Sequence, residues 1–72
     1  MRYGHIDRFA ERPGIGLIQP DDGGEAYSFD FFHIEGWKGE TARALGLRAG
    51  RPVEFTAENG TVRTVRLLPF AA

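Results

Sequence analysis

The chain has 72 residues, no cysteine and a formal net charge of −1. This length predicts a single domain with a small core over residues 1–72, and the lack of cysteine excludes disulfides, thiol chemistry and cysteine-based zinc sites. No apolar run approaches the ~20 residues of a membrane span, and the first 15 residues contain no signal-like segment. We therefore expect a cytoplasmic protein with no membrane partner.

Strand signals dominate the chain. Ten glycines and four prolines divide short apolar runs at spacings typical of a small all-β barrel. The predicted strands, in chain order, are Arg2–Phe9, Gly14–Pro20, Glu25–Phe31, Arg51–Ala57 and Thr61–Leu68. We expect tight turns at Asp21–Gly24 and at Asn59-Gly60, because these dipeptides tolerate positive φ.

Alternation predicts which faces of the strands are buried. Val53 and Phe55 alternate with polar residues, so they should point inward. The last predicted strand does not alternate cleanly. Its inward face is either Val65 with Leu67, which we favour, or Val62 with Thr64.

The longest connection lies between the third and fourth strands. Within it, residues 40–45 are good helix formers, and Gly46 can supply a positive-φ stop. One or two helical turns cannot stand alone, so packing must hold them.

Charge is distributed unevenly along the chain. Residues 1–36 hold three arginines against seven acids, whereas residues 37–72 hold six cations against three acids. A general nucleic-acid binder is usually basic over its contact face, because neutralising phosphates drives affinity. Here the basic half is the C-terminal one.

Several motifs together point to a known family. These are Gly14-x-Gly16-x-Ile18, the turn that begins at Pro20, and Gly50-x-x-Val53-x-Phe55, with Phe31 and Ile34 between them. In their joint spacing they resemble the cold-shock domain family, over about half the chain. The resemblance implies an all-β fold, a five-stranded antiparallel barrel of the oligonucleotide-binding (OB) type, with one short helical turn between strands 3 and 4. A small SH3-like barrel is the alternative.

The residues that grip nucleic acid in the family are largely replaced. The family's Lys-Gly-Phe-Gly-Phe is Pro13–Leu17 here, its Phe-Val-His-Phe is Ser28–Phe31, and its Lys-Trp-Phe is Asp7–Phe9. Four stacking aromatics are therefore absent, at Arg8, Ile15, Leu17 and Ser28. At ~1 kcal/mol each, their loss costs about three orders of magnitude in affinity.

Two functions from different classes follow. The resemblance implies a cold-shock-like protein that binds single-stranded RNA or DNA without catalysis, more weakly than its family. Arg8, Phe31, Trp37 and Lys38 would carry the remaining contacts. Alternatively, the barrel is a protein-interaction module whose apolar patch contains Ile15, Leu17, Phe31 and Trp37. The long connection either folds over this patch or leaves it exposed.

A second candidate surface is basic. The C-terminal half supplies five arginines that would form a patch if the last strand and the long connection lie together. These residues are Arg43, Arg48, Arg51, Arg63 and Arg66. Solvated surface is the alternative interpretation of the same charges.

No catalytic or metal-binding constellation is visible in the sequence. His5 and His33 fall on different elements with no third ligand at the required spacing. There is no nucleophile–base pairing and no cofactor motif. We expect no enzyme activity, no metal, no cofactor and no small-molecule substrate.

Overall fold

The computed structural model describes residues 1–70, so the last two residues of the predicted 1–72 domain lie outside the described residues. The elements are β1 (Arg2–Ala10), β2 (Ile15–Pro20), β3 (Tyr27–Asp30), the 3₁₀ turn η1 (Phe31–His33), α1 (Ala42–Leu45), β4 (Pro52–Glu58) and β5 (Thr61–Leu67). The five strands form one antiparallel sheet in the order β3-β2-β1-β4-β5. Each predicted strand is confirmed to within two residues at either end. The helical turn predicted between strands 3 and 4 is α1.

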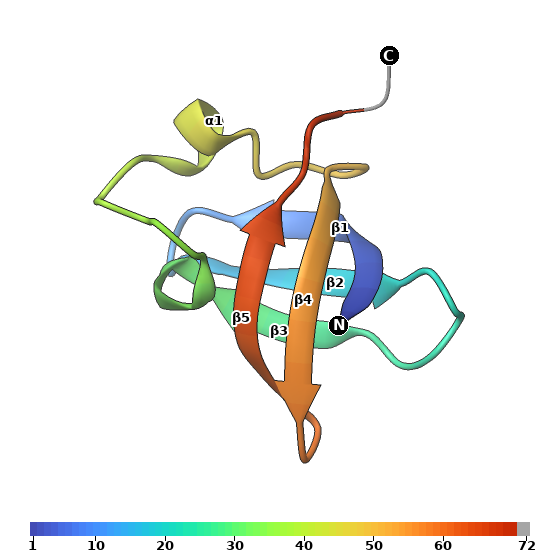
Figure 1. The fold of residues 1–72 in the computed structure, drawn as a ribbon. Coiled ribbons are helices and arrows are strands. Elements are labelled where there is room, and N and C mark those ends of the chain that lie inside the picture. The colour runs from blue at the N-terminus through green and yellow to red at the C-terminus, as the bar shows by residue number, and fades with distance from the viewer. Residues whose placement is uncertain (71–72) are drawn as a thin grey trace.

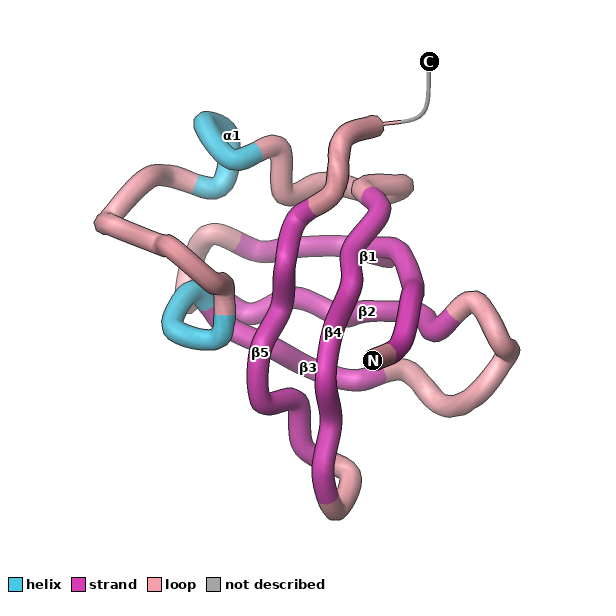
Figure 2. Tube along the Cα trace, viewed as in Figure 1, coloured by secondary structure: helices cyan, strands magenta, loops and turns pink. Residues whose placement is uncertain are grey.

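The sheet curls into a nearly closed barrel of the OB type. In Figures 1 and 2, β4 and β5 cross in front of β1, β2 and β3. The two edge strands approach each other beside η1, where Ile34 bridges Val65 and the Glu35 amide donates to the Val65 carbonyl oxygen at 2.8 Å. The predicted fold class is therefore confirmed.

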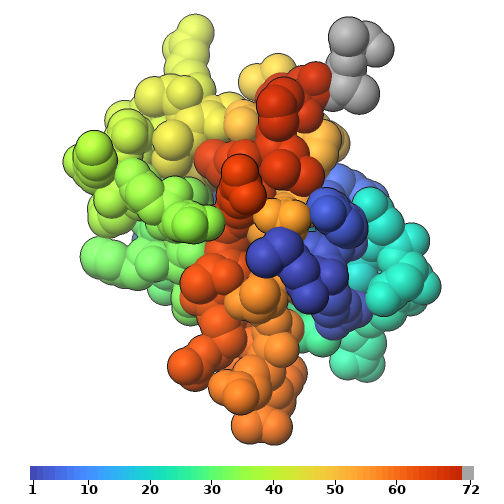
Figure 3. Space-filling view, in the orientation of Figure 1, coloured from blue at the N-terminus to red at the C-terminus, as the bar shows by residue number. Residues whose placement is uncertain are grey.

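The core lies between the crossing strands. It consists of ten buried apolar residues: Ile6, Ile18, Phe29, Ile34, Ala42, Leu47, Val53, Phe55, Val62 and Val65. None of the helices in residues 1–70 is long and apolar enough to cross a membrane. The space-filling view shows the β4–β5 hairpin projecting from one end of the molecule, and α1 and the C-terminal segment at the other (Figure 3).

The inward face of β5 corrects the predicted alternation. Val65 is buried as favoured, but Val62 is buried as well, and Leu67 is only half-buried. The reason is a β-bulge: Thr64 pairs with Thr56 and Val62 with Ala57, so Arg63 is an extra residue in β5. The extra residue shifts the period, and neither strict alternation describes the strand.

Two glycines in and before β2 accommodate three aromatic rings. A Cβ on Gly16 would lie 2.5 Å from Phe9 Cδ2 and 2.8 Å from Phe29 Cε1. A Cβ on Gly14, whose φ is +94°, would lie 3.1 Å from Phe31 Cδ2. The rings of Phe9, Phe29 and Phe31 therefore pack directly on the glycine backbone. Glycine is required at both positions because a side chain would overlap a ring, and at Gly14 also because of the positive φ.

The long connection is fastened at both ends of α1. Thr41 caps the helix by accepting from the Ala44 amide at 3.1 Å, and Gly46 ends it with φ +69°. The Glu11 carboxylate, from the β1–β2 turn, accepts from the Ala42 amide at 2.9 Å. Ala42 and Leu47 enter the core, so packing holds this short helix in place.

We expect Gly16→Ala to destabilise the barrel by on the order of 1–3 kcal/mol, because the new methyl group overlaps two packed rings. Each 1 kcal/mol should lower Tm by roughly 4–8 °C in a thermal melt. Gly24→Ala is the control, since its Cβ meets no atom closer than 3.4 Å. Equal melting temperatures for the two variants would show that the ring packing does not need Gly16.

We expect Glu11→Ala to loosen α1, because the Ala42 amide loses its acceptor. Hydrogen exchange at Ala42 should accelerate by roughly fivefold, the equivalent of about 1 kcal/mol. Glu11→Gln keeps an acceptor oxygen at the same reach and should exchange nearly like the original chain. Unchanged exchange in the alanine variant would mean that packing alone holds the helix.

Candidate functional site

The outer face of β1, β2 and β3 carries the positions at which the chain differs from the motifs of the cold-shock family that it resembles. Leu17 lies opposite Arg8 on β1 and opposite Ser28 on β3, while Ile15 lies opposite Asp30. Residues directly opposite in antiparallel strands share a face, so these side chains lie together. We call Arg8, Ile15, Leu17, Ser28 and Asp30 the outer face. It has an aliphatic centre with one cation and one carboxylate, and no aromatic ring.

Part of this face is hollowed and open to solvent. A shallow apolar groove of about 480 Å³ is lined by Arg8, Phe9, Ala10, Ile15, Gly16 and Leu17. Ile15 is 50% exposed. The long connection therefore leaves the aliphatic patch uncovered, which decides between the two predicted arrangements at this position.

Asp30 has a structural task at the end of β3. Its carboxylate accepts from the Phe32 amide at 2.9 Å, and the His33 Nδ1 accepts from the Asp30 amide at 3.1 Å. Together these bonds form a capping box that starts η1. The other histidine, His5, has its Nδ1 3.3 Å from an oxygen of Asp21, in the turn after β2.

Aromatic rings gather beside the outer face, where η1 turns away from β3. Phe31 and Trp37 stack with centroids 5.0 Å apart and planes at 19°, and Phe32 meets Trp37 edge to face at 5.3 Å. We call Phe31, Phe32 and Trp37 the aromatic corner. Phe9 joins the corner to the outer face, because it contacts Phe31 at 5.1 Å and lines the apolar groove.

The three rings of the corner differ in what they offer a ligand. Phe31 lies between Phe9 and Trp37, with Gly14 beneath it, so it mainly supports the others. One face of Trp37 is covered by Phe31, and the ring as a whole is half-buried. Phe32 is 84% exposed. The most accessible stacking surface therefore belongs to a residue absent from the predicted site.

Sequence reasoning passed over Phe32 although a signal was present. Phe31 and Phe32 are adjacent in the chain. Consecutive residues at a strand end point to opposite sides, so a pair of phenylalanines cannot place both rings in one core. The strand was predicted to end at Phe31, and the second ring was left without a role.

Hydrogen bonds fix the orientation of Trp37 and the position of Lys38. The Trp37 Nε1–H donates to the Glu40 carbonyl oxygen at 2.9 Å, and the Lys38 amide donates to the Glu40 carboxylate at 2.6 Å. The latter bond holds the pKa of Glu40 below its usual value. The exposed Lys38 ammonium is thus carried on a tight turn beside the corner.

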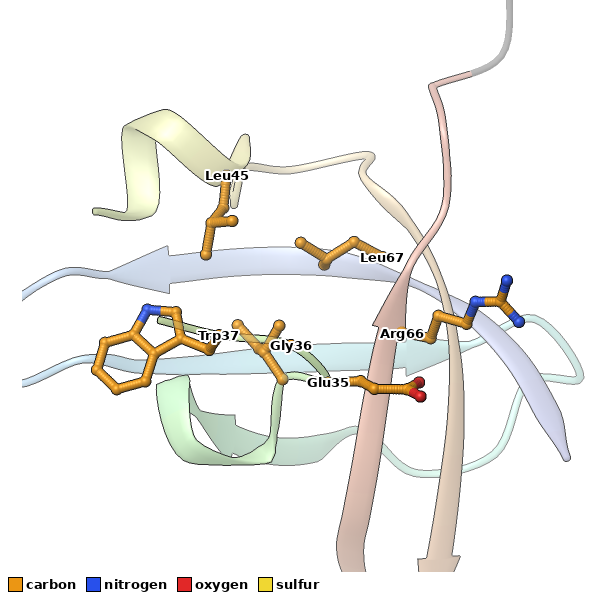
Figure 4. Close-up of a pocket in the computed structure, with 7 residues that line it drawn as sticks. Glu35, Gly36, Trp37, Leu45, Arg66 and Leu67 are labelled. Atoms are coloured by element: carbon orange, nitrogen blue, oxygen red, sulfur yellow. The ribbon is translucent and has the colours of Figure 1, made fainter. Parts of the chain in front are cut away.

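A second, smaller pocket lies behind Trp37. Figure 4 shows it between the segment Glu35–Trp37, Leu45 of α1, and Arg66 and Leu67 of β5. Its volume is about 210 Å³. The Trp37 ring extends away from β5, and the Arg66 guanidinium points to the opposite side (Figure 4). The predicted basic residue Arg66 is therefore not directed at the aromatic corner.

The five predicted patch arginines do not share one environment: two pairs have different contacts, and Arg43 stands apart from both. Arg63 lies 3.8 Å from Glu58 and Arg66 lies 3.5 Å from Glu54, so carboxylates face both β5 cations. Arg48 and Arg51 instead lie over the ring of Phe70, at 4.3 and 5.1 Å from its centroid. Arg43 is exposed on α1.

Comparison with known proteins adds one relative. No family model matches the chain. It is similar to glycine-rich protein 2 of Nicotiana sylvestris, with 40% identity over 57 residues, which is 79% of this chain. The matched region is 24% of the relative, so the chain spans about a quarter of that protein's length.

Proposed function

We propose that this protein is a cold-shock-like, non-catalytic binder of single-stranded RNA or DNA. Its affinity is lower than that of cold-shock domains that keep the stacking aromatic residues. The OB-type barrel, the motif spacing around Gly14 and Gly16, and the likeness to glycine-rich protein 2 are compatible with this proposal. A cytoplasmic location belongs to the same proposal.

The observation that carries the proposal is the exposed ring of Phe32 set against Trp37. Phe32 is 84% exposed, and a nucleobase is a flat apolar partner that can stack on its ring. Lys38 follows Trp37 directly in the chain, so a cation adjoins the aromatic corner. These are the residues with which the chain would hold a short stretch of single strand.

The replaced positions explain why the affinity is low. Stacking contributes ~1–3 kcal/mol per base, and the outer face offers no ring to a base. Asp7 and Asp30 add repulsion toward phosphate on the same strands. One or two stacked bases at the aromatic corner support binding in the micromolar range or weaker.

A second candidate function is supported by the apolar groove. Half-exposed Ile15 lies beside Leu17, and the groove contains no acid. Such a patch with a polar border fits a protein partner better than a phosphate chain. Failure of oligo(dT) and oligo(rU) to change the fluorescence emission of Trp37 would favour this second function.

We expect Phe32→Ala to weaken binding of oligo(dT) and oligo(rU) by about 5- to 150-fold at low salt, because one stacking ring is lost. The emission of Trp37 reports binding without a label, since it is the single tryptophan. Tyr3→Ala is the matched control: it removes another exposed ring, from the start of β1.

Stability should separate binding from folding in this experiment. Phe32 is largely outside the core, so the variant should melt within a few degrees of the original chain. Equal loss of affinity in the Phe32 and Tyr3 variants, or none in either, would contradict stacking at the aromatic corner.

A further inference from the structure

The arginine cluster, which we define as Arg43, Arg48 and Arg51, is unlike the other patch arginines. No carboxylate in residues 1–70 forms an ion pair with any of its members, whereas Arg63 and Arg66 each face a glutamate. The cluster therefore keeps its positive charge in a chain whose net charge is −1.

Arg51 is the fixed member of the cluster. Its Nε donates to the Leu68 carbonyl oxygen at 2.7 Å, and its Nη1 donates to the Leu45 carbonyl oxygen at 2.6 Å. These bonds tie the end of α1 to the segment after β5. Within residues 1–70, these two bonds use Nε and Nη1 of Arg51 and leave Nη2 without a side-chain hydrogen bond.

Arg48 places a second guanidinium beside the first. Both lie over Phe70, and burial together with the charge of Arg48 lowers the pKa of Arg51. Two like charges held on one ring repel each other, and an anion between or above them relieves that repulsion. Phosphate oxygens are the anions that arginine forks match best.

The cluster is connected to the aromatic corner through Leu45. Leu45 and Trp37 line the same pocket, and the carbonyl oxygen of Leu45 accepts from Arg51. Figure 1 shows α1 and the C-terminal segment at the same end of the molecule. A strand that leaves Trp37 along α1 therefore reaches Arg48 and Arg51 without crossing the outer face.

Resting on the proposed function, we propose that the arginine cluster is the phosphate-binding part of the site. Bases of a single strand stack on the aromatic corner, and the phosphates on one side of it pass over α1 to Arg43, Arg48 and Arg51. The Asp30 carboxylate on the outer face repels a phosphate backbone there. Stacking and charge neutralisation thus occupy separate surfaces of the barrel.

The test is the salt dependence of oligonucleotide binding by the Arg43→Gln/Arg48→Gln double variant. Arg51 is left unchanged because its hydrogen bonds hold the fold. Each lost phosphate contact should reduce the slope of log K against log salt by ~0.7, or about 1.4 for both. The Arg63→Gln/Arg66→Gln double variant is the control, because it removes the same number of charges from arginines that already face glutamates. The salt slope of this control should stay near that of the original chain.

An abasic oligomer of deoxyribose phosphate separates the two surfaces. Phe32→Ala should weaken binding of oligo(dT) and leave abasic binding unchanged, while the Arg43/Arg48 variant should weaken both. If the slope of log K against log salt is equal in the two double-arginine variants and Phe32→Ala still weakens oligo(dT) binding, the arginine cluster does not bind phosphate. The proposed function would still stand. Absence of any oligo(dT) binding by the original chain would overturn both.

Discussion

The arrangement of the whole site depends on aromatic rings that pack against the backbone of two glycines in and before β2. Phe9 and Phe29 lie over Gly16, and Phe31 lies over Gly14. This packing fixes Phe31, which in turn stacks on the ring of Trp37. A side chain at either glycine would displace the rings that hold the aromatic corner in place.

The same packing separates architecture from recognition. Core residues and glycines specify the barrel, and they do so whichever residues occupy the outer face. On that face, Ile15 and Leu17 present aliphatic side chains, and Asp30 is the cap of η1. The accessible ring, Phe32, lies two residues beyond β3, and the arginine cluster has Arg43 in α1 with Arg48 and Arg51 after it. In the proposed function, recognition therefore lies at the ends of the elements.

The sequence was sufficient to predict the strands, both tight turns and the helical turn, because each has a local cause. Asn59 and Gly60 both adopt positive φ, as their dipeptide indicated, and Gly46 ends α1. The bulge at Arg63 was not predictable, since the extra residue is set by pairing with β4 and not by the period of β5 itself. Nonlocal pairing determined the buried face.

The candidate site was predictable only in part, for a similar reason. Trp37 and Phe31 were identified from motif spacing, but their mutual stacking depends on a connection held by Glu11 and Glu40. The division of the arginines depends on which of them meets a glutamate across β4 and β5, and alternation alone does not give that register. The contact of Phe70 with Arg48 and Arg51 was likewise not predictable, because it joins residues that are far apart in the chain.

The central claim is that a single strand meets the aromatic corner and the arginine cluster, and avoids the outer face. The most direct measurement is a ¹⁵N–¹H correlation spectrum of the protein titrated with oligo(dT) at low salt. We expect the largest shifts at the Phe32 amide, the Trp37 indole and the Arg48 side chain, with the Leu17 and Ser28 amides nearly unmoved. Large shifts at Leu17 and Ser28, with Phe32 and Trp37 unchanged, would contradict it.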